Sequence, residues 1–150
     1  GWKQEPDDYL ERILGHDRLE KLNPIQTFRD HDIVVSFGSD APCTTPDPIA
    51  WMDRAVNNGN AGQAVSVQDA LRMCTYNGAW AAFDEQERGS LEAGKIADMA
   101  VLTENPYTVP KDKIKDIRVE RLYLGGKPYE SCRENILPMM LRGLTSRNKA

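Results

Sequence analysis

One short apolar run constrains the fold of this chain more than any other feature of its sequence. Residues 32–37 are Asp-Ile-Val-Val-Ser-Phe, and they lead directly into Gly-Ser-Asp-Ala-Pro at 38–42. A run that is almost continuously apolar favours a strand buried on both faces, as in a parallel sheet. Such a strand needs a neighbouring strand on each edge, yet residues 1–85 offer no second convincing strand. On its own, the strand is difficult to accommodate in a self-sufficient domain.

The elements expected around this run divide the chain into regions of different character. Helices and the one buried strand alternate over residues 1–85, which is the order typical of an α/β fold. Strands joined by tight turns follow at 86–132, without a helix between them. A final helix from about 133 to 144 and a basic tail complete residues 133–150. The sequence therefore predicts an α/β part, an all-β part and a helical C-terminal segment.

Local signals place the individual elements within these regions. Helices are expected at 6–14, 17–22 and 24–30, from Asp47-Pro48 onward, and from Ser66 to about 83. An interruption is expected in the last of these helices at Asn77-Gly78. The expected strands are 96–102 and 118–124, and Gly125-Gly126 is typical of a two-residue hairpin turn. Lys111-Asp112-Lys113 is interpreted as a solvated charge cluster.

Length and composition exclude several classes of protein. The 150 residues are too few for a complete eight-stranded α/β barrel, which needs about 250. A net charge of −4, from 19 basic and 23 acidic residues, argues against nucleic-acid binding. No apolar run approaches the roughly 20 residues that span a bilayer, which argues against a membrane partner. Three widely spaced cysteines, Cys43, Cys74 and Cys132, argue against a disulfide framework and favour a reducing, cytoplasmic location. Because the chain starts at Gly1, a targeting segment could lie upstream.

Asp40 is the strongest candidate site residue. It lies just past the carboxyl end of the predicted buried strand, which is where α/β sheets and barrels carry their chemistry. A carboxylate there could bind a metal ion or act as a general base. Alternatively, its side chain could simply cap a turn. The neighbouring Cys43 could be near the same site, whereas Ser39 does not lie in the G-x-S-x-G pattern of a nucleophilic serine.

The segment 89–96 resembles a phosphate-binding loop only superficially. Its sequence, Gly-Ser-Leu-Glu-Ala-Gly-Lys-Ile, lacks the final hydroxyl residue that would contact magnesium. The expected context is also reversed, because a helix precedes the loop and a strand follows it. Two β-turns are the favoured interpretation, and nucleotide binding is a minor alternative.

The two histidines do not suggest a metal site. His16 and His31 lie on or near helices without HxH or HxxxH spacing, and zinc needs three or four ligands. Both are interpreted as surface or capping residues. Cys74, Trp51 and Trp80 lie in expected helices and are interpreted as packing residues.

Several segments, in order, carry a resemblance to a known family. They are residues 34–42, residues 66–71 with 75–79, and residues 89–102, and residues 23–28 add to the match. Together they resemble the C-terminal part of the amidohydrolase superfamily, most closely the amidohydrolase family 3 branch of metal-dependent hydrolases.

The resemblance implies a fold and a role for each region. It implies the C-terminal part of a TIM-type (β/α)8 barrel over 1–85, with residues 33–37 as the eighth strand. It implies strands of a small composite β-sandwich over 86–132, in which Gly94-Lys95 and Asp98 form a structural signature. Asp40 matches the acid that contacts the metal and takes a proton from the attacking water. A bound divalent metal, most often zinc, lowers the pKa of that water.

The resemblance also implies an incomplete site. The other metal ligands of the family lie on earlier barrel strands, and neither His16 nor His31 falls on their positions. The first hypothesis is therefore the C-terminal part of a metal-dependent amidohydrolase that cleaves an amide or cyclic-amide C–N bond of a small-molecule substrate, with the chain alone inactive. The alternative is a non-catalytic remnant that acts as a binding or homo-oligomerisation module through residues 33–37.

Overall fold

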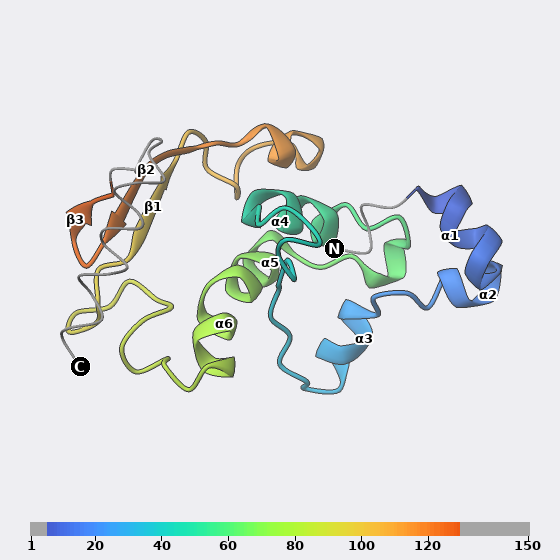
Figure 1. The fold of residues 1–150 in the computed structure, drawn as a ribbon, viewed down its shortest axis with the longest axis horizontal. Helices are drawn as coiled ribbons and strands as arrows, with labels where there is room; N and C mark the ends of the chain where they lie inside the picture. Colours follow the sequence, from blue (N-terminus) through green and yellow to red (C-terminus); the bar gives the residue numbers. More distant parts are fainter. Residues whose placement is uncertain (1–5, 130–150) are drawn as a thin grey trace.

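The computed structural model describes residues 6–129, in which the strands lie together at one end of the molecule (Figure 1). The elements in chain order are α1 (Asp7–Leu14), α2 (His16–Leu19), α3 (Ile25–Asp30), α4 (Pro48–Val56), the 3₁₀ helix η2 (Ala61–Gln63), α5 (Val67–Cys74), α6 (Tyr76–Ala81), β1 (Met99–Leu102), the 3₁₀ helix η3 (Lys111–Asp116), β2 (Val119–Leu124) and β3 (Lys127–Pro128). The fold is thus a mixed arrangement of helices and one small antiparallel sheet. The final helix expected near 133–144 and Cys132 lie outside the described residues.

The helix starts follow the local signals in the sequence. The carboxylate of Asp47 accepts hydrogen bonds from the backbone N–H groups of Ile49 and Ala50, at 3.1 and 3.2 Å, and Pro48 is the first residue of α4. Ser66 caps α5 by accepting from the N–H of Asp69 at 3.1 Å. Each cap satisfies backbone donors that have no partner within the helix. Both predicted starts are therefore confirmed.

The helical region that begins at Ser66 breaks earlier than the sequence predicts. The interruption lies at Thr75, with φ −126° and ψ −92°, between α5 and α6. The Thr75 hydroxyl donates to the carbonyl of Leu71 at 2.8 Å, which offers the backbone an alternative to a continuing helix. Asn77 and Gly78, the predicted point of interruption, lie inside α6 instead.

The sheet is a three-stranded antiparallel ladder in the order β1-β2-β3. Met99 pairs with Tyr123, and the register between β1 and β2 shifts between Val101 and Leu102. Gly125 and Gly126 join β2 to β3 with φ values of 57° and 75°, which glycine adopts without strain and which two-residue hairpin turns require. The predicted hairpin is therefore confirmed, although β1 is shorter than the strand expected at 96–102.

The core lies between α4, α5 and η3. Met52 of α4, Met73 of α5 and Ile114 of η3 have exposed fractions of only 1%, 2% and 0%. Residues 111–113 are interpreted from the sequence as a solvated charge cluster. They are exposed as predicted, but they also begin η3, which brings Ile114 and Ile117 into the core against α4. This contribution was missed because two apolar residues three positions apart in a charged segment are too few to establish a helical period.

The predicted strand at 32–37 is the main departure from expectation. Residues 33–39 form an extended segment outside any sheet. Ile33 and Val34 are 51% and 45% exposed, so the prediction of burial on both faces is wrong for them, whereas Val35 and Phe37 pack against the core. The physical reason is that, among residues 6–129, no strand lies beside the segment, and its backbone bonds to helices instead.

The N-terminal helix buries little of its apolar face. Leu10 of α1 is 6% exposed, whereas Tyr9 and Ile13 are 42% and 58% exposed. Gly15, with φ 77°, ends α1 as predicted, and its N–H donates to the carbonyl of Glu11 at 2.7 Å. Between residues 6 and 129, no helix has both the length and the apolar character needed to cross a membrane.

Candidate functional site

Asp40 lies in an exposed turn that follows the extended segment 33–39. Its φ is 53°, in the left-handed region that Asp tolerates better than most residues. Its carbonyl accepts a hydrogen bond from the N–H of Cys43 at 2.9 Å, which closes the turn. Its side chain is exposed, and no described residue forms a hydrogen bond or ion pair with its carboxylate. The carboxylate is therefore available to a group from outside this turn.

The residues around Asp40 organise the turn. Ser39 accepts a hydrogen bond on its hydroxyl from the N–H of Ala41, at 3.2 Å, and on its carbonyl from the hydroxyl of Thr44. The following peptide, Ala41-Pro42, is cis. Capping of the turn was the alternative role considered for Asp40, but in the structure Ser39 supplies the side chain that accepts a backbone N–H. Ser39 thus has a structural role here.

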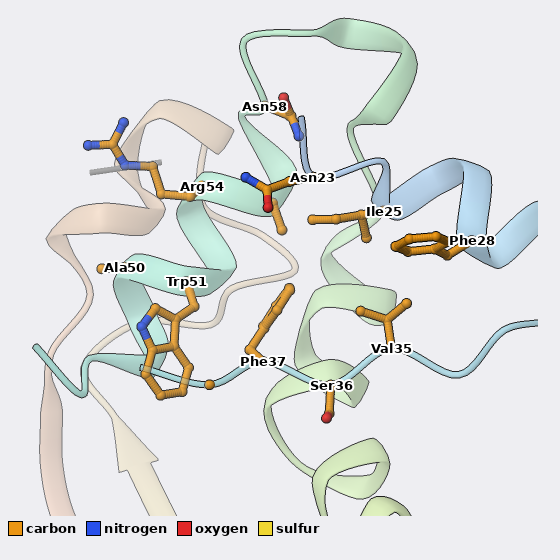
Figure 2. Close-up of a pocket in the computed structure, with 12 residues that line it drawn as sticks. Asn23, Ile25, Phe28, Val35, Ser36, Phe37, Ala50, Trp51, Arg54 and Asn58 are labelled. Atoms are coloured by element: carbon orange, nitrogen blue, oxygen red, sulfur yellow. The ribbon is translucent and has the colours of Figure 1, made fainter. Parts of the chain in front are cut away.

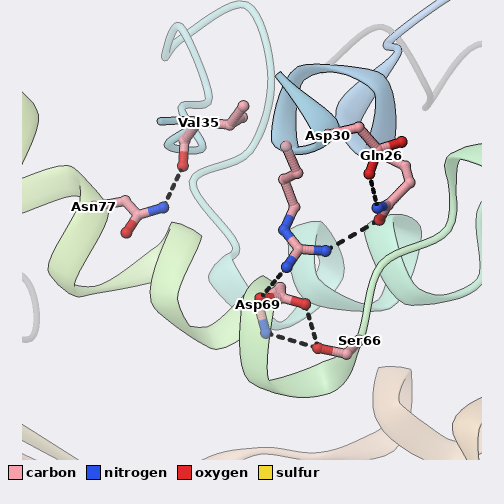
Figure 3. Close-up of polar contacts among 7 residues, drawn as sticks. Gln26, Asp30, Val35, Ser66, Asp69 and Asn77 are labelled. Atoms are coloured by element: carbon pink, nitrogen blue, oxygen red, sulfur yellow. Dashed lines mark hydrogen bonds and ion pairs between the residues drawn. The ribbon is translucent and has the colours of Figure 1, made fainter. Parts of the chain in front are cut away.

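Helices on one side hold the extended segment in place. The N–H of Ile33 donates to the carbonyl of Phe28, at 2.9 Å, and the N–H of Phe37 donates to the carbonyl of Met73, at 3.1 Å. The side-chain amide of Asn77 donates to the carbonyl of Val35 at 2.7 Å, as Figure 3 shows. Sequence reasoning missed this contact, because Asn77 followed by Gly was interpreted only as a helix interruption. Its spacing of four residues from the buried Met73 was the available signal.

An ion pair fixes the two helices beside the segment. The Arg29 guanidinium of α3 lies 2.8 Å from the Asp69 carboxylate of α5, and it also donates to the Gln26 side chain at 3.1 Å (Figure 3). Both charged side chains are partly buried. Because α3 precedes the segment and α5 follows it, this pair stabilises the frame from which Asp40 extends.

A groove of about 570 Å³ lies between the extended segment and helices α3 and α4. Figure 2 shows Phe28 of α3 and Trp51 of α4 around Val35, Ser36 and Phe37, and the lining continues to Gly38, two residues before Asp40. The groove is mainly apolar, with polar side chains that include Asn23, Arg54 and Asn58. The indole Nε1 of Trp51 is buried without a hydrogen-bond acceptor among residues 6–129. The groove could take an apolar group close to the turn that bears Asp40.

The described residues do not form a metal site by themselves. His16 lies at the surface beside Glu11 and Glu20, at 3.2 and 3.6 Å, and a ring nitrogen of His31 lies 2.8 Å from the Thr27 carbonyl. Both therefore have the surface and capping roles that were predicted. Over residues 6–129, no group of three or more His, Cys, Asp or Glu side chains could hold a metal ion. Asp40 would be a single ligand.

The two described cysteines differ in environment. Cys43 is exposed in the turn after Asp40. Cys74 is packed against the core at the end of α5, as predicted, and burial raises the pKa of its thiol from 9.0 to about 12. A thiol with so high a pKa is almost entirely protonated near neutral pH, so Cys74 is a poor nucleophile or metal ligand.

The loop 89–96 engages its lysine internally. The Lys95 ammonium donates to the Ser90 hydroxyl at 2.6 Å and lies 5.8 Å from the centre of the Tyr76 ring, with only 13% of the side chain exposed. It also lies 3.4 Å from Glu92, and the pKa of that carboxyl is lowered by hydrogen bonds from Ser90 and Lys95. The loop follows α6 and precedes β1, which is the reverse of a phosphate-binding context. The structure agrees with the interpretation as turns.

Comparisons with known proteins agree with one another. The model of the amidohydrolase family matches residues 4–129. The chain is 34% identical over 132 residues to N-substituted formamide deformylase of Arthrobacter pascens, covering 83% of this chain and 22% of that protein. It is 29% identical over 131 residues to Protein LONG AFTER FAR-RED 3 of Arabidopsis thaliana, covering 80% of this chain and 22% of that protein.

A solved structure supports the fold. The crystal structure of an amidohydrolase from Thermotoga maritima MSB8 matches with a TM-score of 0.57 and 24% identity, over 71% of this chain and 25% of that one. At this identity the likeness concerns the fold alone. The chain thus spans 22% of the length of each of the two curated relatives named above.

Proposed function

This chain belongs to the amidohydrolase family, and on that premise we propose that the protein of which it forms part hydrolyses a C–N bond in an amide or a cyclic amide. The observation that carries the proposal is the family match over residues 4–129, which includes Asp40 and the segment before it. A relative that is 34% identical over 132 residues is named N-substituted formamide deformylase, and formamides contain a C–N bond of this class. The substrate is a small molecule.

Asp40 is the residue to which we assign the chemistry of this chain. Its carboxylate is exposed and unpaired among residues 6–129, so a water molecule or a substrate can reach it. We propose that it acts as a general base, accepting a proton from the water that attacks the carbonyl carbon. The adjacent groove offers apolar contacts for the remainder of the substrate.

The proposal includes a divalent metal ion, with zinc preferred, in the whole protein. The described residues do not fit such an ion alone, because Asp40 is one carboxylate and zinc needs at least three protein ligands. Further ligands would have to come from outside residues 6–129. We therefore propose that this chain alone is inactive and that a TIM-type barrel, completed by other parts of the protein, surrounds Asp40. The proposed location is the cytoplasm.

The test is an Asp40→Asn substitution in the full-length protein. We expect hydrolysis of N-substituted formamides or cyclic amides to fall by at least about 100-fold, since removal of a general base costs about 10²–10⁴-fold. Asp112→Asn is the matched control, because Asp112 is also exposed but lies on η3. Full activity in Asp40→Asn, with the control also active, would exclude Asp40 as the base. Chelation and restoration with zinc test the metal separately.

One observation favours a second candidate function. Ile33 and Val34 are about half exposed, which is unusual for consecutive β-branched residues in an extended segment. A protein that is a non-catalytic binding or homo-oligomerisation module could cover them with a partner strand. Sedimentation of the full-length protein, compared with an Ile33→Lys variant, distinguishes this function. A monomer at all concentrations contradicts it, whereas an oligomer that Ile33→Lys dissociates supports it.

A further inference from the structure

Among the bonds that the described residues 6–129 form, those to the extended segment 33–39 lie along one edge only. Its partnered groups are the N–H groups of Ile33 and Phe37 and the carbonyls of Val35 and Ser39. These are alternate residues, and in extended backbone alternate residues direct their polar groups to the same edge. The helices and the Asp40 turn therefore hold one edge of the segment, and these bonds fix where each of its residues lies relative to the helices.

Asn77 makes the central contact on this edge. Of the bonds to the segment from α3, α5 and α6, its contact with the Val35 carbonyl is the one made by a side chain, and at 2.7 Å it is the shortest. The amide comes from α6, 42 residues further along the chain. It is half-buried, so water competes weakly for the Val35 carbonyl. The contact therefore links α6 to a point five residues before Asp40.

We propose that Asn77 is a positioning residue for Asp40, an inference that rests on the function proposed above for that carboxylate. By holding the Val35 carbonyl, Asn77 fixes where the segment ends and thus where the turn presents Asp40. The residue touches neither Asp40 nor the groove, so its effect passes through the backbone of the segment. Its loss displaces the base together with the part of the groove wall formed by residues 35–38, while the contacts from α3 and α4 stay in place.

The isosteric substitution Asn77→Asp tests this role. The carboxylate keeps the shape of the amide but offers an acceptor to the Val35 carbonyl, which is itself an acceptor. Asn57 provides the matched control, because its amide also donates to a distant backbone carbonyl, that of Lys111, at 2.8 Å. Asn57→Asp removes the same kind of bond between the end of α4 and η3, together with a bond to the Asp53 carboxylate at 2.9 Å, and both lie away from the segment.

In the full-length protein, we expect Asn77→Asp to lower kcat about tenfold or more, since a misplacement of about 1 Å can cost about 100-fold. KM should change by a smaller factor than kcat, because Ile25, Phe28 and Trp51 of α3 and α4 still line the groove. Hydrogen exchange of residues 33–40 should become faster in Asn77→Asp and not in Asn57→Asp. Asn77→Ala, which removes the donor without adding charge, should show the same pattern.

Three outcomes would overturn the proposal. An unchanged kcat in both Asn77 variants, an equal loss of kcat in Asn57→Asp, or failure of both Asn77 variants to fold would each assign Asn77 a structural role only. The function proposed for Asp40 is judged separately by Asp40→Asn. If Asp40→Asn is inactive while both Asn77 variants retain kcat, the positioning role of Asn77 is excluded and the proposed role of Asp40 stands. If Asp40→Asn is fully active, the proposed base fails, and any effect of Asn77 has another cause.

Discussion

At the scale of single residues, the surroundings determine which polar groups remain available for chemistry. The Asp40 carboxylate has no partner among residues 6–129, whereas Lys95 and Arg29 are committed to contacts within the fold. The cysteines show the same contrast, because Cys43 is exposed and Cys74 is packed against the core. Chemical labelling of the two thiols measures this difference directly.

We expect the Cys74 thiol to react with iodoacetamide much more slowly than Cys43 at pH 8. Burial raises its pKa from 9.0 to about 12, so the thiolate is scarce below that pH and access is restricted. Burial favours the protonated thiol of Cys74 in the folded state. The stability that this preference contributes is fully present below pH 9 and is lost as the pH rises through about 12. Peptide mass spectrometry measures both rates. In urea, where the protein is unfolded, we expect the two rates to be similar. Equal rates in the folded protein would contradict the prediction.

At the scale of elements, close approach between α6 and the loop that follows it requires a glycine. Gly89 has φ 89°, and a Cβ atom added there would lie 2.6 Å from the Cβ of Ala79 and 3.1 Å from the Cα of Tyr76. Gly94, at the far side of the same loop, has φ 95°, but a Cβ atom added there would have no neighbouring atom within 4 Å. A substitution at Gly94 therefore tests the backbone conformation alone, whereas a substitution at Gly89 tests the conformation together with the steric contact.

We expect Gly89→Ala to lower the free energy of unfolding by about 2–4 kcal/mol, from left-handed strain and from overpacking against α6. Gly94→Ala should cost only the strain, about 1–2 kcal/mol. Urea denaturation followed by tryptophan fluorescence measures both values. A similar loss in the two variants would show that the contact with Ala79 does not limit the approach of the loop.

At the scale of the whole molecule, η3 joins the sheet to the helices. It lies between β1 and β2 in the chain, yet its Ile114 and the adjacent Ile117 belong to the core formed with α4 and α5. The sheet and the helical part are therefore not independent, although the chain changes from helices to strands near residue 86. The proposed division of the chain at this point, and the barrel and sandwich around it, stay predictions for the full-length protein.

We expect Ile114→Ala to lower the free energy of unfolding by about 2–5 kcal/mol, because it empties a fully buried position. Ile13→Ala is the matched control, since Ile13 is 58% exposed on α1 and should lose less than about 0.5 kcal/mol. Urea denaturation, followed in both variants by one signal that reports on helices and sheet together, measures the two free energies of unfolding. Equal losses would mean that η3 does not hold the two parts together.

Features that depend on near neighbours in the chain could be predicted from the amino-acid sequence alone. The helix starts at Asp47 and Ser66 and the turn at Gly125-Gly126 were predicted correctly, because each involves groups within three residues of one another. The family resemblance was likewise carried by short segments in order, and the family match confirms it. The role of Asp40 stays a prediction, because it depends on ligands beyond these residues.

Which distant segments meet could be learned only from the folded chain. The extended state of residues 33–39, the burial of Ile114 and the contact of Asn77 with Val35 all depend on partners far along the chain. An apolar run indicates that a segment can be buried, but not whether strands or helices will cover it. Here helices hold one edge of the segment, because no strand lies beside it among residues 6–129. That arrangement gives Asp40 its exposed position.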